Sequence, residues 1–196
     1  MNRALIIFVK NPVLGQVKTR LAADVGEEKA LKVYQELLKY TKAISCQVSA
    51  KRYLFYANQI EENDAWSREE FLKKVQSGRD LGARMSNAFA EVVEEKKVII
   101  GSDCPQLLSK DIESAFHHLD RFDLVIGPAN DGGYYLLGMK AVQHSLFKEM
   151  EWSTEKVFQE TLNRAKAANL KVKVLRELVD LDTLQDLEET GFKLGE

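Results

Sequence analysis

The sequence has few of the residues that mark disulfide-rich or membrane-embedded chains. Its 196 residues include only two cysteines, Cys46 and Cys104, which is too few for a disulfide framework. The apolar run at residues 4–9 is far shorter than the ~20 residues of a membrane-spanning helix, and it is short for the core of a secretory signal. We therefore expect a cytoplasmic protein with reduced thiols and no membrane span.

The sequence also lacks a large excess of basic over acidic residues, or of acidic over basic ones. Twenty-eight Lys and Arg stand against 30 Asp and Glu, for a formal net charge of −2. A general nucleic-acid binder would show a basic excess, so no nucleic-acid partner is expected. The hydrophobic content of 45% is too high for a disordered chain. The length fits one domain, which we expect to span residues 1–196.

Proline is scarce, and its positions show where loops begin. Pro12, Pro105 and Pro128 each lie at or just beyond the end of an apolar run. Apolar runs and amphipathic segments alternate along the chain. The expected strands are residues 4–9, 53–57, 98–100, 124–127, 134–139 and 172–175. The expected helices are residues 27–44, 81–95, 109–119 and 153–168, a short one after 67–70, and a last one capped by Asp182 with Gln185 at its third position.

This alternation predicts an α/β fold, a sheet covered by helices on both faces. The short helix after residues 67–70 is expected because Ser67-Arg68-Glu69-Glu70 has the pattern of a capping box. In α/β sheets, ligands bind outside the carboxyl ends of the strands. The informative residues should therefore lie in the loops that follow the strands.

The first such loop, residues 10–21, reads KNPVLGQVKTRL. Lys10, Lys18 and Arg20 bring three cations to the start of a helix, where free backbone amides already favour anions. Together with Gly15 and Thr19 they form a candidate phosphate-binding site, the alternative being a solvated basic loop. The segment matches neither the Walker pattern nor G-x-G-x-x-G.

A second motif, at residues 78–85, reads GRDLGARM. Two glycines flank Asp80 at the start of a helix. Asp80 is either a helix N-cap or part of a backbone segment that approaches a ligand. Arg84, in the first turn, would then face the pocket.

Acidic residues follow three of the expected strands. Asp103 and Asp180 are candidate ligands of a divalent cation, because Mg²⁺ is usually held by one or two carboxylates and substrate phosphates. For Asp103 the alternative is a plain turn or cap. Asp131 precedes Gly132 and Gly133, which form either a hairpin turn or a close backbone approach to a ligand. Asp131 is the candidate catalytic base, and it could instead hold a metal-bound water. Cys104 is expected to be a packed thiol.

Taken together, the motifs from Lys10 to Thr183 resemble a known family. The pattern is K-x-P-x-x-G-x-V-K-T-R-L, G-x-D-L-G-x-R-M, G-x-D-C-P, G-P-x-x-D-G-G-Y-Y-L-x-G, W-S-T and D-x-D-T. It is similar to small bacterial glycosyltransferase-like proteins of the nucleotide-diphospho-sugar transferase superfamily. This group was long catalogued as a domain of unknown function, and some members are assigned to arsenosugar biosynthesis. The resemblance implies a GT-A-like three-layer fold with a mostly parallel, mixed sheet.

The resemblance also implies roles for the motif residues. Lys10, Gly15, Lys18 and Arg20 would surround a nucleotide diphosphate, and Asp80 and Arg84 would line the same cleft. Asp103 stands where such enzymes place the metal-binding acid of a D-x-D motif. The chain has one acid in Ser102-Asp103-Cys104, so Asp180 or Asp131 would supply the missing carboxylate to Mg²⁺ or Mn²⁺.

The function implied first is glycosyl transfer from a nucleotide-diphosphate sugar to a small acceptor. The alternative is a nucleotidyltransferase that uses a nucleoside triphosphate and releases pyrophosphate. Molybdenum-cofactor and phospholactate guanylyltransferases of the superfamily share a D-x-D-T-x-x-D-L ending, which residues 180–187 match, but their Gly-Gly-x-G-x-R loop is absent here. A nucleotide-binding protein without turnover is the third possibility.

Overall fold

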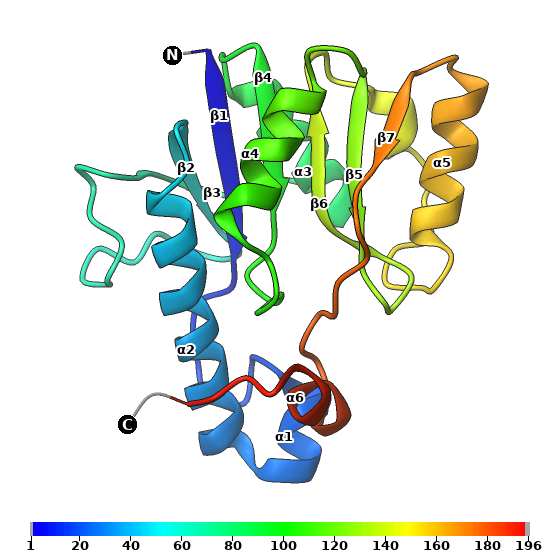
Figure 1. Ribbon diagram of the computed structural model, residues 1–196. Helices are drawn as coiled ribbons and strands as arrows, with labels where there is room; N and C mark the ends of the chain where they lie inside the picture. Colours follow the sequence, from blue (N-terminus) through cyan, green and yellow to red (C-terminus); the bar gives the residue numbers. More distant parts are fainter. Residues whose placement is uncertain (1, 195–196) are drawn as a thin grey trace.

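A computed structural model describes residues 2–194, and its centre is a seven-stranded mixed sheet (Figure 1). The strand order is β3-β2-β1-β4-β6-β5-β7. All neighbouring strands run parallel except β6, which is antiparallel to both β4 and β5. The strands are β1 (Arg3–Val9), β2 (Lys51–Tyr56), β3 (Leu72–Val75), β4 (Lys96–Ile100), β5 (Leu124–Pro128), β6 (Tyr134–Met139) and β7 (Val172–Val174).

Helices cover both faces of this sheet, as the sequence pattern predicts. One face packs on the end of α2 and on α4, and the other packs on α3 and α5. The alternation of side chains in β1 shows the reason: Leu5 and Ile7 join the first cluster, whereas Ala4 and Ile6 join the second. The helices are α1 (Thr19–Val25), α2 (Glu27–Cys46), α3 (Leu81–Glu91), α4 (Ser109–His118), α5 (Val157–Ala167), α6 (Leu184–Thr190) and the short 3-10 helix η1 (His144–Leu146).

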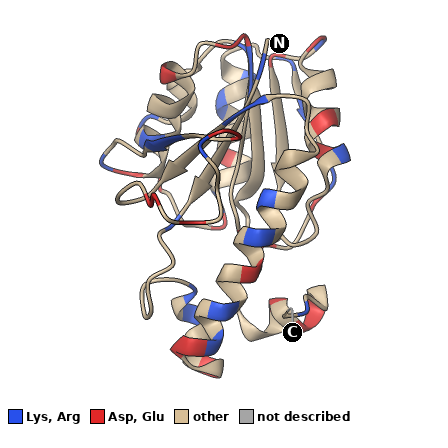
Figure 2. Cartoon of the chain, turned by 90° about the vertical axis from the view of Figure 1, so that its left-hand side faces the viewer, with Lys and Arg blue, Asp and Glu red and all other residues tan. Residues whose placement is uncertain are grey.

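A smaller helical cluster, which we call the helical cap, lies beyond the carboxyl edge of the sheet. It consists of α1, the first half of α2 and α6, and it lies below the strands in Figure 1. Its buried core is formed by Leu21, Ala30, Val33, Leu37 and Leu181. Figure 2 shows α2 running from the sheet into this cap with both acidic and basic residues along it. The cap therefore brings α6 and the residues just before it next to the loop after β1.

The short helix expected after residues 67–70 is absent from the structure. These residues form a turn in which the Ser67 carbonyl accepts hydrogen bonds from the amides of Glu70 and Phe71. Phe71 is buried edge-on against Trp66, with ring centroids 4.8 Å apart. This packing directs the chain into β3, which pairs with β2, so the local capping pattern closes one turn only.

The last helix begins one residue later than expected. Thr183, not Asp182, is its N-cap, and the Thr183 hydroxyl accepts a hydrogen bond from the Asp186 amide. The Asp186 carboxylate in turn accepts from the amides of Asp182 and Thr183. The helix start is thus satisfied without the Asp182 carboxylate, which is left to interact elsewhere. No helix within residues 2–194 is long and apolar enough to cross a membrane.

Candidate active site

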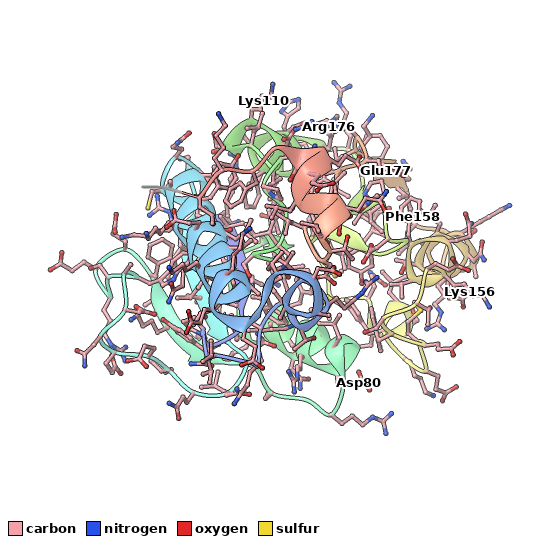
Figure 3. The ribbon with its side chains drawn as sticks, turned by 90° about the horizontal axis from the view of Figure 1, so that it is seen from below. Asp80, Lys110, Lys156, Phe158, Arg176 and Glu177 are labelled. Atoms are coloured by element: carbon pink, nitrogen blue, oxygen red, sulfur yellow. The ribbon has the colours of Figure 1, made fainter. Side chains whose placement is uncertain are left out.

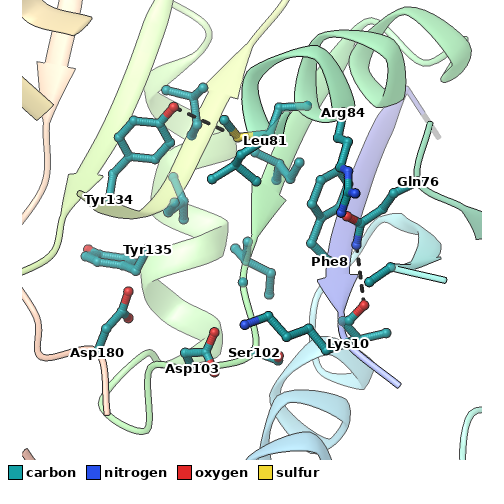
Figure 4. Close-up of a pocket in the computed structure, with 18 residues that line it drawn as sticks. Phe8, Lys10, Gln76, Leu81, Arg84, Ser102, Asp103, Tyr134, Tyr135 and Asp180 are labelled. Atoms are coloured by element: carbon teal, nitrogen blue, oxygen red, sulfur yellow. Dashed lines mark hydrogen bonds between the residues drawn. The ribbon is translucent and has the colours of Figure 1, made fainter. Parts of the chain in front are cut away.

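A pocket of about 310 Å³ opens where β1 and β4 end and β6 begins (Figure 4). Its volume lies at the lower end of the range of small-molecule sites, ~300–1,000 Å³. The chain turns back to β2 on one side of β1, and β4 lies on the other side. Loops leaving such neighbouring strands diverge, which leaves a crevice at the carboxyl edge.

The pocket wall includes four of the residues that the motifs single out. Lys10, Arg84, Asp103 and Asp180 all line it, although they come from four separate loops or helices. Apolar side chains, including Phe8, complete the wall. In Figure 4 the two acids lie at one end, and Arg84 and Phe8 lie at the other. Cations and carboxylates thus share one pocket, as expected for a site that takes phosphates and a metal ion.

Tyr34, from α2, holds two strand ends of this pocket in place. Its hydroxyl accepts a hydrogen bond from the Lys10 amide at 2.8 Å and lies 3.2 Å from both the Lys10 carbonyl and the Ser102 hydroxyl. Burial raises the pKa of Tyr34, and the nearby Asp103 carboxylate raises it further. The phenol therefore stays neutral and fixes the backbone beside Lys10 and Asp103.

Lys18 is buried behind the pocket, and its ammonium joins the β4 loop to the helical cap. Its Nζ donates a hydrogen bond to the Leu181 carbonyl at 2.5 Å, forms an ion pair with Asp103, and lies 3.3 Å from Asp182 Oδ1. Burial alone lowers the pKa of Lys18, but the two carboxylates outweigh it and raise the pKa. Lys18 therefore stays protonated, and its positive charge pairs with carboxylates of the protein itself.

The other residues predicted in the loop after β1 lie outside the pocket wall. Thr19 and Arg20 are exposed on the first turn of α1, and the closest approach of Arg20 to Asp182 is 3.8 Å. Gly15 has φ +74°, a left-handed conformation that favours glycine. Their contact with a phosphate stays a prediction.

Asp80 is the N-cap of α3. Its carboxylate accepts a hydrogen bond from the Ala83 amide at 2.8 Å and lies 3.3 Å from Arg79 Nε. Figure 3 shows Asp80 at the margin of the face seen from below. Asp80 thereby sets the start of the helix that carries Arg84 into the pocket.

Asp180 is partly buried among other carboxylates. Burial raises its pKa, the Asp103 and Asp131 carboxylates raise it further, and the pKa reaches about 8. Lys18 offsets part of this negative potential, and Asp182 adds to it. Such a concentration of acids at one end of a pocket favours a divalent cation. Among the described residues there is no set of three or more His, Cys, Asp or Glu placed to hold a metal ion without further ligands.

The turn at residues 131–133 lies beside the acids but is not part of the pocket wall. The exposed Asp131 accepts a hydrogen bond from the Gly133 amide at 2.8 Å, so the turn closes on itself. Gly132 has φ +85°, and a Cβ there would lie 2.1 Å from the Glu155 carbonyl. Gly132 therefore packs closely against the chain's own backbone just before α5. Ligand contacts of Gly132 and Gly133, and catalysis by Asp131, stay predictions.

The sequence does not indicate the roles of two residues at or near the pocket. Its pattern predicts Asp182 as a helix cap, and only the neighbouring Thr-x-x-Asp spacing indicates that Thr183 caps instead. Gln76 lines the pocket wall, but a lone glutamine after a predicted helical segment gives no sequence signal. Cys104 is buried as expected, and burial raises its pKa to about 12, so it remains a thiol.

Comparisons with known proteins agree with this architecture. A family model described as "Uncharacterized protein conserved in bacteria (DUF2064)" matches residues 41–154. A 2-phospho-L-lactate guanylyltransferase from Methanocaldococcus vulcanius is 25% identical over 190 residues, which cover 94% of this chain and 83% of the relative. This relative is a guanylyltransferase, not an arsenosugar glycosyltransferase of the kind that the resemblance implied.

Solved structures share the fold. A putative nucleotide-diphospho-sugar transferase from Desulfovibrio desulfuricans G20 has a TM-score of 0.88 and 30% identity, over 96% of this chain and 86% of that one. Rv0371c of Mycobacterium tuberculosis, in complex with manganese, has a TM-score of 0.59 and 13% identity, over 96% and 97% of the two chains. The chain therefore belongs to the DUF2064 family and has the GT-A-like fold of nucleotide-diphospho-sugar transferases.

Proposed function

We propose that this chain is a nucleotidyltransferase. It would transfer a guanylyl group from GTP to a small phosphorylated acceptor and release pyrophosphate. The observation that carries the proposal is the similarity to a guanylyltransferase over 94% of the chain and 83% of the relative. The pocket supports it, because cationic and acidic side chains converge on a space of suitable size.

In this proposal Lys10 binds the triphosphate, and Arg84 contacts the nucleotide at the other end of the pocket. Lys10 is exposed at the end of β1 and lines the pocket, so its ammonium is available to phosphate oxygens. Arg84 extends from the first turn of α3, where its Nε donates to the Gly78 carbonyl at 3.3 Å. An Arg held by its Nε keeps its terminal nitrogens and its planar guanidinium available to the nucleotide.

Asp103 and Asp180 would hold a divalent cation. Their carboxylates line the same end of the pocket, where burial and then the charge of Asp103 raise the pKa of Asp180. Two carboxylates completed by phosphate oxygens are a usual donor set for Mg²⁺ or Mn²⁺. When bound, such a cation neutralises charge on the triphosphate and on the leaving pyrophosphate.

The reaction exchanges one phosphoanhydride for another. An acceptor phosphate oxygen forms a bond to the α-phosphorus, and the bond from that phosphorus to the bridging oxygen of the β-phosphate breaks. The electron pair leaves with pyrophosphate. An acceptor phosphate is already anionic at neutral pH, so this reaction needs no general base. The acids around Asp131 then contribute charge to the site instead of accepting a proton.

Glycosyl transfer is the second candidate. The observation that favours it is the similarity to the putative nucleotide-diphospho-sugar transferase at 30% identity. Both reactions would use the same pocket for their nucleotide. They differ in the bond that breaks, since sugar transfer cleaves the bond at the anomeric carbon and releases a nucleoside diphosphate.

One experiment separates the two. The protein is incubated with GTP, Mg²⁺ and 2-phospho-L-lactate, and in parallel with GDP-mannose or UDP-glucose, Mn²⁺ and a panel of sugar and polyol acceptors. We expect pyrophosphate and a guanylylated product by mass spectrometry only in the first set. Release of a nucleoside diphosphate only in the second set would overturn the proposal in favour of sugar transfer.

A matched pair of variants tests the acids. Asp103→Asn is expected to lower pyrophosphate release by at least about 100-fold, since one good electrostatic contact at the reacting centre is worth ~3 kcal/mol. Asp24→Asn, an exposed acid on α1, is the control and should leave the rate unchanged. Equal rates for both variants would contradict the role of Asp103.

A further inference from the structure

Gln76 occupies an unusual position, because it joins the ends of three strands. It directly follows β3, and its backbone amide donates to the Tyr56 carbonyl at the end of β2 at 2.9 Å. Its side-chain Nε2 donates to the Val9 carbonyl of β1 at 3.3 Å and to the Phe55 carbonyl of β2 at 3.0 Å. Both hydrogens of the amide nitrogen are thereby used.

These two bonds fix the direction of the amide. Reversing it would place the amide oxygen against two carbonyl oxygens, which repel it. The oxygen Oε1 therefore points away from these two carbonyls; in Figure 4 the Gln76 amide nitrogen is at the dashed hydrogen bond and the oxygen is turned aside from it. Gln76 lines the pocket, and within residues 2–194 no group donates a hydrogen bond to Oε1. The result is a preset acceptor at the wall of the pocket.

The surroundings of this acceptor suit a flat, aromatic ligand. Phe8 and Arg84 lie beside Gln76 in Figure 4, and the half-exposed Leu81 lies at the start of α3. Phe8 and Leu81 provide apolar surface, and a guanidinium can stack on an aromatic ring. Asp103 and Asp180 are at the other end of the same pocket. A nucleotide with its phosphates near those acids would place its base near Gln76.

We propose that Gln76 selects the base of the nucleotide, with its Oε1 accepting a hydrogen bond from the exocyclic amine of guanine. The inference rests on the proposed nucleotidyl transfer and deepens it by assigning the residue that reads the base. An acceptor with no donor among residues 2–194 is free to accept a hydrogen bond from a ligand in the pocket. The 2-amino group of guanine extends beyond the ring and is absent from hypoxanthine, so the pair of GTP and ITP isolates this one contact.

The test measures binding of GTP and of ITP to the full chain by calorimetry, with Mg²⁺ and no acceptor. For the unmodified protein we expect ITP to bind about tenfold more weakly than GTP, the usual size of one such hydrogen bond. For Gln76→Met, which keeps the length of the side chain but removes the amide, the ratio of the two affinities should fall close to one.

A matched control variant shows whether a change in the GTP-to-ITP affinity ratio is specific to Gln76. Gln159→Met, on the exposed side of α5, should retain the tenfold ratio. Because a ratio within one variant is independent of the fraction folded, partial unfolding of Gln76→Met does not mimic the effect. If Gln76→Met yields no folded protein, the test is the comparison of GTP and ITP affinities for the unmodified protein. Equal affinity for GTP and ITP there would overturn the role of Gln76 alone, whereas no binding of either nucleotide would overturn the proposed function as well.

Discussion

At the scale of single residues, two lysines of the same loop have different tasks. Lys18 is buried and its ammonium is shared among Asp103, Asp182 and the Leu181 carbonyl. Lys10 is exposed and lines the pocket. Because of this difference in burial, Lys18 stabilises the protein, whereas Lys10 is available to a ligand.

Replacing each lysine by methionine tests this division. Lys18→Met leaves two facing carboxylates without their cation. Because both acids are partly exposed, we expect a loss of about 1–2 kcal/mol in the free energy of unfolding, less than for a fully buried pair. Lys10→Met should keep the stability and weaken GTP binding. Urea unfolding and calorimetry measure the two effects, and a stable Lys18→Met protein would contradict the assignment.

Glu94 provides a pH-dependent contribution to stability away from the site. Burial alone raises its pKa, but hydrogen bonds from its own backbone amide and from Tyr53, together with Lys51, outweigh burial and lower the pKa. A lowered pKa means that the native state binds the proton less readily than the unfolded state. The contribution is therefore present above the unfolded pKa and is lost as the pH falls through the folded value.

Glu94→Gln should therefore destabilise the protein by about 1 kcal/mol at pH 7. The difference from the unmodified protein should shrink as the pH falls below about 4. Unfolding curves between pH 3 and 7 check this, with the exposed Glu188→Gln as control. A difference that stays constant over this range would show that the carboxylate charge has no part in it.

At the scale of elements, α2 contacts the ends of both β1 and β4 beside the pocket. Its Tyr34 hydroxyl bonds the backbone at the end of β1 and lies next to Ser102 after β4. One and a half turns later, the Tyr40 hydroxyl of the same helix donates to the Leu107 carbonyl at 2.8 Å, away from the pocket wall.

This pair offers a matched comparison. Tyr40→Phe removes one hydrogen bond and should cost about 1 kcal/mol of stability, whereas Tyr34→Phe removes the hydroxyl contacts with Lys10 and Ser102 and should cost about 1–3 kcal/mol. Only Tyr34→Phe should also weaken GTP binding, because it loosens the backbone beside Lys10 and Asp103. Chemical unfolding and calorimetry separate the effects. Equal binding by both variants would show that α2 does not position the site.

At the scale of the whole molecule, the helical cap depends on Leu181, which is fully buried between α1, α2 and α6. Leu181→Ala should cost about 2–4 kcal/mol. Hydrogen exchange should rise first in α1 and α6 while β1 and β4 stay protected, because the cap has a separate core. Uniform loss of protection would mean that cap and sheet unfold together.

Most elements of this fold follow from local pattern. The apolar runs predict β1, β2 and β4 to β7, and Asp103 and Asp180 follow strands as expected. The exception is β3, where a capping pattern predicts a helix. Burial of Phe71 against Trp66 decides for a strand, and such a contact cannot be read from residues 67–70 alone.

The sequence by itself determined the α/β class and predicted that Lys10, Arg84, Asp103 and Asp180 lie at one edge of the sheet, where they line one pocket. Periodicity and the rule that parallel strands end at one edge are local or general, so they need no coordinates. Only the tertiary structure decided that Lys18 forms an ion pair with carboxylates and that Thr183, not Asp182, caps the last helix. It also decided that the Gln76 amide nitrogen, not its oxygen, is directed at the strand carbonyls. Each of these depends on partners distant in sequence, and hydrogen bonds and ion pairs act only between atoms that folding has brought together.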